Sequence, residues 1–315
     1  MSLPGRILYH LWHQPVAAVR RSRRHGGPVV QWRAARGRDA MQSATALLPP
    51  LPTRPVTSAP FAVHLLTGRR FAYQTAFCLY SLGHHCPAAL APELYDDGTL
   101  DAASRASLGR ICPAARIHDH SDLLTRLDQF LPIARFPTLR ERWKNYPHIR
   151  KLIDVHLGRT GWRLVLDSDL LFWREPRFLL DWSASPDRLL HATDCTENYG
   201  YPRNLLERLA GAPVPPLVNV GLCGLRSDLL DWDFLEHAAT TLIRECGTSY
   251  YLEQGLVALL AARQPDGCAI APAGDYITLP SAAEIASPSA VMHHYVDTSR
   301  DGYHTIAWRH AFVAR

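Results

Sequence analysis

Short apolar runs alternate with longer segments of helical periodicity along most of the chain. The apolar runs predict strands at residues 62–67, 93–98, 115–118, 162–166, 218–225 and 290–295. Helical spacing predicts helices at 73–82, 101–108, 121–131, 149–157, 233–245 and 251–262. Strands that alternate with helices are typical of an α/β domain with a mostly parallel sheet flanked by helices. After residue 295 we expect a loop rich in histidine and aromatic side chains.

The first 60 residues differ from the rest in pattern and charge. Apolar residues recur at helical spacing from Ile7 to Val19, a second helical stretch covers about 29–46, and residues 48–60 read as a proline-rich linker. Residues 1–55 carry nine arginines and one acidic residue, whereas the remainder is slightly acidic. We therefore expect a basic helical N-terminal extension over residues 1–60 and the main domain over residues 61–315.

The basic extension suggests two kinds of contact. A helix with Trp12 and trailing arginines could lie on an anionic membrane. The alternative, favoured because Pro15 interrupts the apolar pattern, is a helix docked on its own domain with its arginines in solvent. A nucleic-acid binder would usually spread basic residues over its folded domain, so no nucleic-acid partner is expected.

The sequence also predicts where the protein works. Its apolar runs fall short of the ~20 residues of a membrane span, and no signal peptide is recognisable. The seven cysteines are dispersed and include no C-x-x-C pair, which argues against a disulfide framework or a zinc site. We expect a cytoplasmic protein, with peripheral contact at the inner membrane surface as an open option.

Two acidic residues, Asp167 and Asp169, directly follow the predicted strand 162–166. At the carboxyl end of a parallel strand they would face a ligand crevice, where two carboxylates can hold a divalent cation and the cation a diphosphate. The alternative is a structural turn. A second pair, Asp231 and Asp233, has the same spacing but fits a helix N-cap with a first-turn acid. Context, and not spacing, therefore favours the metal site at Asp167 and Asp169.

An apolar strand that ends in this motif also occurs in haloacid-dehalogenase-type phosphatases. Those enzymes use a lysine downstream of the motif to steady the phosphate. Here the only lysines, Lys144 and Lys151, both precede it. A phosphatase of that type is therefore not expected.

Several segments, in order, resemble GT-A glycosyltransferases, most closely family 8, which includes glycogenin and bacterial galactosyl- and glucosyltransferases. They are an Arg-bearing helix followed by Leu-Asp-x-Asp (149–169), Asn-x-Gly (218–225), Glu-Gln in place of Asp-Gln (251–256), and a late His (291–295). The late His lacks the usual G-x-x-K-P-W continuation, and residues 1–60 have no counterpart. The resemblance covers about residues 61–300 and implies a GT-A-like, Rossmann-related α/β fold.

The resemblance implies a hexosyltransferase that takes a sugar from a nucleotide-sugar, usually a UDP-sugar, and uses Mn²⁺ or Mg²⁺. Asp167 and Asp169 would bind the metal, and Asp167 also the donor ribose. His293 or His294 would complete the metal shell. Because adjacent residues of a strand face opposite sides, only one of the two can do so, and we favour His294 for its place before Tyr295. The acceptor, whether a glycan, a lipid-linked sugar or another molecule, is not identified.

Other matched positions would surround the donor. Arg150 or Lys151 would set a cation against the diphosphate, or else belong to a solvated helix face. Asp96 and Asp97 would bind uracil or ribose, or else form a D-G turn. The remaining expected donor contacts are Thr67, Asn219 and Gly221.

The resemblance also implies which residues surround the transferred sugar. Glu253 and Gln254 would lie near the anomeric centre, where a carboxylate can stabilise an oxocarbenium-like transition state or orient a hydroxyl. Glu253 could instead be a first-turn acid favoured by the helix dipole. Asp194, Glu197 and Asn198 form a polar loop expected to meet donor sugar or acceptor. The family resemblance favours retention of the anomeric configuration.

Two other functions remain as alternatives. One is a non-catalytic relative that kept the fold and binds sugar or nucleotide. The other is a nucleotidyltransferase that makes nucleotide-sugars, although its usual Gly-rich start is replaced by Leu66-Thr-Gly-Arg-Arg70.

Overall fold

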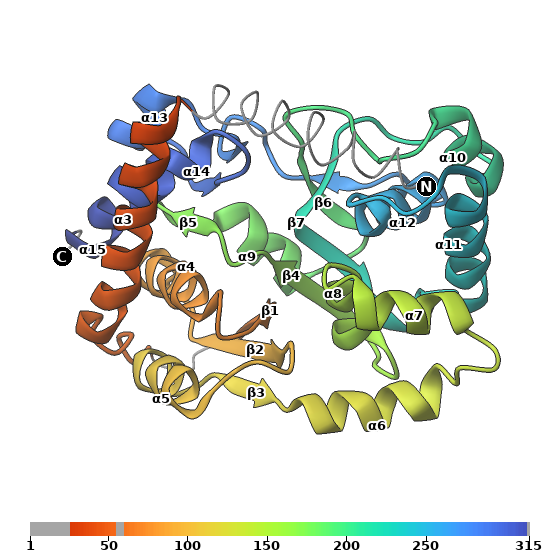
Figure 1. Ribbon diagram of the computed structural model, residues 1–315, viewed down its shortest axis with the longest axis horizontal. Helices are drawn as coiled ribbons and strands as arrows, with labels where there is room; N and C mark the ends of the chain where they lie inside the picture. The colour runs from red at the N-terminus through yellow and green to blue at the C-terminus, as the bar shows by residue number, and fades with distance from the viewer. Residues whose placement is uncertain (1–25, 55–59, 314–315) are drawn as a thin grey trace, which may run out of the picture.

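A seven-stranded sheet forms the centre of the protein, whose computed structural model describes residues 26–54 and 60–313 (Figure 1). The strand order is β3-β2-β1-β4-β7-β6-β8. Neighbours pair in parallel except at β7, which is antiparallel to both β4 and β6, so the expected mostly parallel sheet is confirmed. The strands are β1 (Phe61–Thr67), β2 (Leu90–Asp96), β3 (Arg116–His118), β4 (Trp162–Leu166), β6 (Leu190–Thr193), β7 (Val218–Arg226) and β8 (Ala269–Ile270).

A small second sheet lies next to the end of β4. It has the order β5-β10-β9, with strands β5 (Leu170–Phe172), β9 (Tyr276–Thr278) and β10 (Met292–His294). β5 begins directly after Asp169 and pairs antiparallel with β10, so that Leu170 lies opposite His294. This pairing brings the late histidines to the acidic residues that follow β4.

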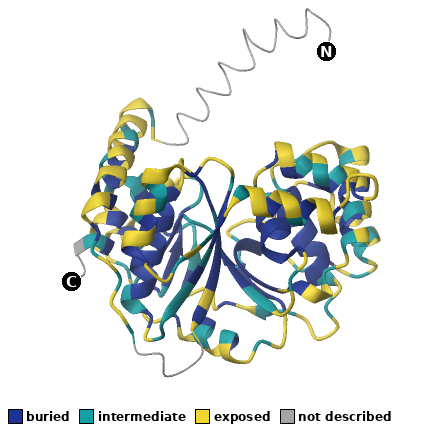
Figure 2. Ribbon diagram, turned by 90° about the horizontal axis from the view of Figure 1, so that it is seen from below, coloured by how far each residue is buried: buried dark blue, intermediate teal, exposed yellow. Residues whose placement is uncertain are grey.

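Helices cover both faces of the large sheet, and buried residues gather on the strands and on the inner sides of the helices (Figure 2). One large apolar cluster joins the sheet to α4 (Ala72–His85), α5 (Ala102–Ile111) and α9 (Arg177–Ala184). A second joins it to α6 (His120–Phe130), α7 (Pro137–Asn145), α8 (Ile149–His156), α10 (Arg203–Ala210), α11 (Trp232–Cys246) and α12 (Leu252–Ala262). Alternate residues of β1 point to opposite faces of the sheet. Val63 and Leu65 lie in the first cluster, and His64 and Leu66 lie on the opposite side.

The predicted helix caps are present. The Asp101 carboxylate accepts a hydrogen bond from the Ser104 backbone at the start of α5, and Asp231 accepts one from Phe234 at the start of α11. Asp233 forms an exposed ion pair with Arg135. The second acidic pair of the sequence is therefore a helix start, as its context predicts.

The expectation of a loop after residue 295 is wrong, because this segment is helical. It forms α14 (Ser299–Gly302), the π-helical turn η4 (Tyr303–Ala307) and α15 (Trp308–Val313), preceded by α13 (Ala282–Ala286). Tyr303 and Trp308 are buried in the first apolar cluster. A helical backbone can carry these rings into the core because its polar groups hydrogen-bond to one another. The aromatic residues of this segment therefore belong to packed helices and not to a loop.

The helix expected near residues 29–46 is present as α3 (Pro28–Ala44), followed by the short turn η2 (Thr45–Leu47); another short turn, η3 (Ser227–Leu229), follows β7. The buried residues of α3 recur at helical spacing; they are Ala34, Gly37, Met41 and Ala44. Gly37 packs directly on η4, because an added Cβ would lie 2.2 Å from the His304 carbonyl oxygen. α3 is thus docked beside η4 and α14 (Figure 1). The helix predicted from Ile7 to Val19 lies outside the described residues.

None of the helices in the described ranges has both the length and the apolar character needed to cross a bilayer.

A buried histidine predicts how the stability of this fold depends on pH. His156 is buried at the end of α8, with Nδ1 2.9 Å from Ser227 Oγ and Nε2 without a partner among the described residues. Burial, helped by the charge of Arg163, lowers the pKa of His156 to about 3. Below about pH 6.5 the unfolded chain binds a proton at this histidine, whereas the native state does not. The free energy of unfolding therefore keeps its full value above about pH 6.5 and decreases as the pH falls.

We expect urea denaturation to show a free energy of unfolding that drops between pH 7 and pH 5, with this residue contributing up to about 1.4 kcal/mol per pH unit. In His156→Gln the free energy of unfolding should drop less steeply with pH. His237→Gln, at an exposed position of α11, should show the wild-type pH dependence. Equal slopes for wild type and His156→Gln would contradict the assignment.

Candidate active site

The carboxyl ends of β1, β2 and β4 lie at one edge of the large sheet, and predicted site residues gather there. Thr67 and Asp96 end β1 and β2 and are opposite each other in register, while Asp167 follows β4. Because β7 runs the other way, its early residues Asn219 and Gly221 reach the same edge. The Asp167 backbone N–H donates to the Gly221 carbonyl at 2.8 Å.

Asp167, Asp169 and His294 form a cluster that could hold a metal ion. One ligand atom from each lies within 4.8 Å of the others. His294 Nε2 is 3.7 Å from Asp167 Oδ2 and 3.4 Å from Asp169 Oδ1. Neighbouring ligands in an octahedral shell with bonds of about 2.1 Å are about 3 Å apart, so small side-chain rotations would bring these three atoms to that spacing and leave the other positions open. Two carboxylates with one imidazole form a donor set that could hold a divalent cation.

The side-chain amide of Asn219, on β7, orients the imidazole of His294. Its Nδ1 lies 3.2 Å from Asn219 Oδ1, and the same oxygen accepts the Gly221 N–H at 2.9 Å. An amide oxygen at Nδ1 calls for a proton there, which leaves Nε2 as the ring atom that would bind a metal ion. The ring occupies the space that a side chain at Gly221 would need, since an added Cβ would lie 2.1 Å from His294 Cε1.

The neighbouring His293 faces away from this cluster. It is fully buried, accepts a hydrogen bond from Trp173 Nε1 at 2.9 Å, and its Nε2 lies 3.0 Å from Glu284 Oε1. Of the two adjacent histidines, the structure therefore brings His294 to the acidic pair.

Arg300, in α14, adds a positive charge beside the cluster. It was not among the predicted residues. Its Nη2 donates to Asp169 Oδ2 at 3.0 Å, and its side chain is half exposed. Burial acts to raise the pKa of Asp169, but the hydrogen bond to His294 and the charge of Arg300 hold that pKa well below its usual range. The available signal was weak: Arg300 is the first cation after the late histidine, where the family's lysine-bearing continuation is missing.

Lys151 links the metal cluster to the predicted catalytic carboxylate. Its Nζ lies 2.7 Å from Asp167 Oδ1 and 3.3 Å from Glu253 Oε2. Burial acts to lower the pKa of Lys151, yet the charges of the two carboxylates hold it above its usual value. Burial raises the pKa of Glu253 to about 7, with Lys151 opposing the shift. The ammonium group thus stays charged between two carboxylates.

Arg150 and Lys151 are both buried, so the alternative of a solvated helix face is wrong. The Arg150 guanidinium donates to the carbonyl oxygens of Asp96 and Asp97 at 2.9 and 2.6 Å, and to Asp154 Oδ2 at 2.7 Å. It therefore fixes the end of β2 against α8.

The two acidic residues at the end of β2 differ. The buried carboxylate of Asp96 accepts from the backbone of Gly98 at 2.8 Å and of Leu100 at 3.1 Å, which is the turn geometry considered as its alternative role. Asp97 is partly exposed and packs against Gly68, where an added Cβ would meet its carboxylate at 2.1 Å. Nucleotide contacts by either residue, or by Thr67, stay predictions.

Gln254 joins the polar loop that follows β6. Its Nε2 donates to Asp194 Oδ2 at 2.9 Å and to the Asn198 carbonyl at 3.1 Å. Glu197 does not join this contact and instead forms an ion pair with Arg203 at 2.7 Å. The structure therefore brings Gln254, Asp194 and Asn198 together and leaves Glu197 apart.

Two aromatic residues that the sequence did not single out border Glu253. The Tyr146 hydroxyl accepts from the Glu253 backbone at 3.3 Å and donates to the Tyr250 carbonyl. Tyr250 is exposed and packs edge-on against His148, with ring centroids 4.7 Å apart. Only the fold brings them beside the start of α12.

The close fit of Gly221 to His294 gives a prediction about metal binding. Gly221→Ala would push the imidazole away from Asp169, so we expect Mn²⁺ affinity, measured by calorimetry, to fall about 10–100-fold. Gly109→Ala is the matched control, because nothing lies within 4 Å of an added Cβ at this helical position. Unchanged affinity in Gly221→Ala would show that His294 is not a ligand.

Comparisons with known proteins bear on the fold. No protein-family model and no curated protein matches the chain. Among solved structures, the galactosyltransferase LgtC in complex with donor and acceptor sugar analogs aligns with a TM-score of 0.50 at 14% identity, over 74% of this chain and 86% of its own. Mouse xyloside xylosyltransferase 1 aligns at 0.48 and 12% identity, over 74% and 97% of the two chains. The bifunctional glycosyltransferase WbbM aligns at 0.47 and 12% identity, over 82% of this chain and 52% of its own.

The likeness to LgtC shows a shared fold. The chain has the GT-A fold of glycosyltransferases, as the sequence resemblance implied. The cluster of Asp167, Asp169 and His294 lies at the carboxyl edge of that sheet, where open α/β folds bind ligands.

Proposed function

We propose that this protein is a metal-dependent glycosyltransferase that moves a sugar from a UDP-sugar to a glycan, a lipid-linked sugar or another acceptor. The observation that carries the proposal is the cluster of Asp167, Asp169 and His294 at the carboxyl edge of a GT-A sheet. The likeness to LgtC, a galactosyltransferase whose structure holds donor and acceptor sugar analogs, supports the same reaction class.

The chain offers cationic groups that suit a diphosphate. When bound, Mn²⁺ or Mg²⁺ would neutralise charge on the departing nucleotide. Asp167, Asp169 and His294 would hold that ion. Arg300 is half exposed, and its planar fork matches phosphate oxygens, so we propose that it turns from Asp169 to the donor.

Arg150 and Lys151 support the donor site from behind. Lys151 lies within 3.3 Å of two carboxylates, and Arg150 holds the end of β2. We propose that Lys151 fixes Asp167 for metal and ribose binding, while Arg150 fixes the loop that carries Asp97. Thr67, Asp96 and Asp97 would then contact the nucleoside, and Asn219 and Gly221 the sugar.

We propose that Glu253 and Gln254 act at the anomeric centre. A carboxyl group whose pKa is raised by burial to about 7 can exchange a proton near neutral pH, which suits a group that orients or releases a sugar hydroxyl. Gln254, held by Asp194 and Asn198, would present its amide to the sugar or the acceptor. Glu197 would contribute from the rim of the same loop. We infer retention of anomeric configuration from the family resemblance.

The setting of the enzyme is also part of the proposal. We place it in the cytoplasm, with its basic N-terminal arm in peripheral contact with the inner membrane surface. All seven cysteines are free, which agrees with a reducing compartment.

Thermal stability in the presence of nucleotide-sugars tests the proposal. We expect one UDP-sugar to raise the melting temperature with Mn²⁺ and to lose this effect with a chelator, because a ligand that binds only the native state stabilises it. Transfer of the sugar can then be followed with candidate acceptors.

Other outcomes would point to the alternative functions. Metal-dependent stabilisation without hydrolysis or transfer would favour a non-catalytic sugar-binding relative. Turnover that requires pyrophosphate would favour a nucleotidyltransferase. Absence of stabilisation by every UDP-, GDP- or other nucleotide-sugar tried would contradict the transferase proposal.

A further inference from the structure

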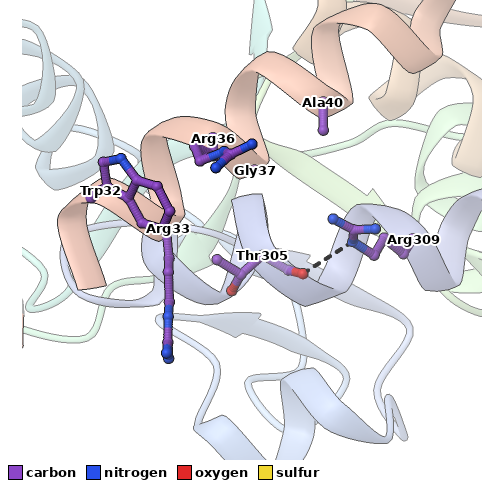
Figure 3. A pocket seen from close by; sticks show the side chains of 7 residues that line it. All are labelled: Trp32, Arg33, Arg36, Gly37, Ala40, Thr305 and Arg309. Carbon is purple, nitrogen blue, oxygen red and sulfur yellow. Dashed lines mark hydrogen bonds between the residues drawn. The ribbon is translucent and has the colours of Figure 1, made fainter. Parts of the chain in front are cut away.

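A hollow of about 520 Å³ lies between α3 and the last helices of the chain, and none of the residues placed in the active site line it (Figure 3). Trp32, Arg33 and Arg36 line it from α3, and Thr305 and Arg309 line it from η4 and α15. We call these residues the α3 groove. The close contact of α3 with η4 at Gly37 fixes the two walls relative to each other.

The groove carries three arginines, Arg33, Arg36 and Arg309, that form no ion pair with an acidic side chain of residues 26–54 and 60–313. Arg36 lies over the Trp32 ring at 4.9 Å, and Arg309 donates to the Thr305 carbonyl at 3.2 Å. These contacts orient the guanidinium groups but do not neutralise their charge within the described part of the chain, so the groove complements an anionic surface.

Apolar side chains stand exposed on the same two helical segments. Val29 and Trp32 on α3 are 60% and 57% exposed, and Ile306 on η4 is 41% exposed. The opposite side of α3 is buried, so the helix is held in place while this side faces outward. Exposed arginines beside tryptophan and aliphatic residues are typical of a surface that lies at the level of lipid headgroups.

We propose that the α3 groove docks the protein on the anionic surface of a phospholipid membrane. The arginines would bind lipid phosphates, and Trp32 would enter the interface. Residues 1–25, which lead directly into this region, carry five arginines and no acidic residue, so the positive charge continues along the chain. The inference extends the membrane contact proposed for the arm to described residues, and it does not depend on the transferase activity.

Vesicle co-sedimentation of the full chain tests this inference. We expect binding to vesicles of phosphatidylcholine with phosphatidylglycerol and little binding to phosphatidylcholine alone. Replacing Arg33, Arg36 and Arg309 with Gln should lower the partition coefficient by about fivefold per arginine, roughly a hundredfold in all. Arg116, Arg174 and Arg263 are exposed arginines outside the groove, and replacing them with Gln changes the net charge equally but should preserve binding.

Tryptophan fluorescence provides an independent readout. Vesicles with phosphatidylglycerol should shift the emission of the wild-type protein to shorter wavelength, and Trp32→Phe should lose most of that shift. The metal-dependent stabilisation by a nucleotide-sugar should survive in both groove variants, so failure of this inference is distinguishable from failure of the proposed function.

Several results would overturn the inference. One is equal vesicle binding by the groove variant and the control variant, which would leave binding to the arm alone. Another is release from vesicles by millimolar inorganic phosphate, which would indicate a site for a small soluble anion. Binding of a nucleic acid in preference to vesicles, or loss of nucleotide-sugar stabilisation in the groove variant, would also contradict a dedicated membrane surface.

Discussion

Asp169→Asn is expected to abolish metal-dependent donor binding while leaving the fold intact. Asparagine keeps the size of the side chain but removes a negative charge that attracts a divalent cation, and Asp169 is the carboxylate shared by His294 and Arg300. Calorimetry with Mn²⁺ alone should show the loss of affinity without reference to any sugar. Thermal stabilisation by a UDP-sugar with Mn²⁺ should disappear in the same variant.

The second acidic pair supplies the matched control for this experiment. Asp233→Asn changes the same residue type in the same Asp-x-Asp spacing, but Asp233 lies at the start of α11 and pairs with exposed Arg135. It should bind Mn²⁺ and donor as wild type does. Near-ultraviolet circular dichroism should be unchanged in both variants, and undiminished Mn²⁺-dependent binding in Asp169→Asn would rule out the metal site.

Lys151→Met is expected to lower the free energy of unfolding by about 3–5 kcal/mol, the usual cost of removing one partner from a buried ion pair. The ammonium group lies between Asp167 and Glu253, and methionine fills similar space without charge. Two carboxylates would then face each other with no cation between them. Urea denaturation at neutral pH measures the loss.

The chain's only other lysine is the control. Lys144 is exposed on α7, so Lys144→Met should change stability by no more than about 0.5 kcal/mol. Adding Glu253→Gln to Lys151→Met should recover part of the lost stability, because it removes one unpaired carboxylate. Wild-type stability in Lys151→Met would mean that the ion pairs contribute nothing to the native state.

The central strands and the longer helices were predictable because each carries its own periodicity. β1 alternates between two apolar clusters, and α12 begins and ends within a residue of its predicted range. The short strands β5, β6, β8 and β9 and the helices α7, α9 and α10 were not predicted. Each has few apolar residues and forms only through pairing or packing with segments distant in sequence, as β5 does with β10. The last helices were missed because their aromatic residues suggested a loop.

The candidate site was predictable where residues follow strand ends. Asp167, Asp169 and Asn219 come together because the strands that carry them are neighbours in the sheet. The choice between His293 and His294 required the pairing of β10 with β5. Arg300 and Tyr146 were missed because each reaches the site by tertiary contact, and a lone arginine or tyrosine has no local signature.

The contact between α3 and η4 has a consequence for synthesis of the protein. Gly37 meets the backbone of His304, so α3 packs on a surface that is synthesised 267 residues later (304 − 37). At about 5–20 residues per second, α3 waits tens of seconds before that surface exists. During this time the apolar side of α3, with Met41 and Ala44, remains open to chaperones. Truncation after α12 would therefore leave α3 without the surface on which Gly37 packs.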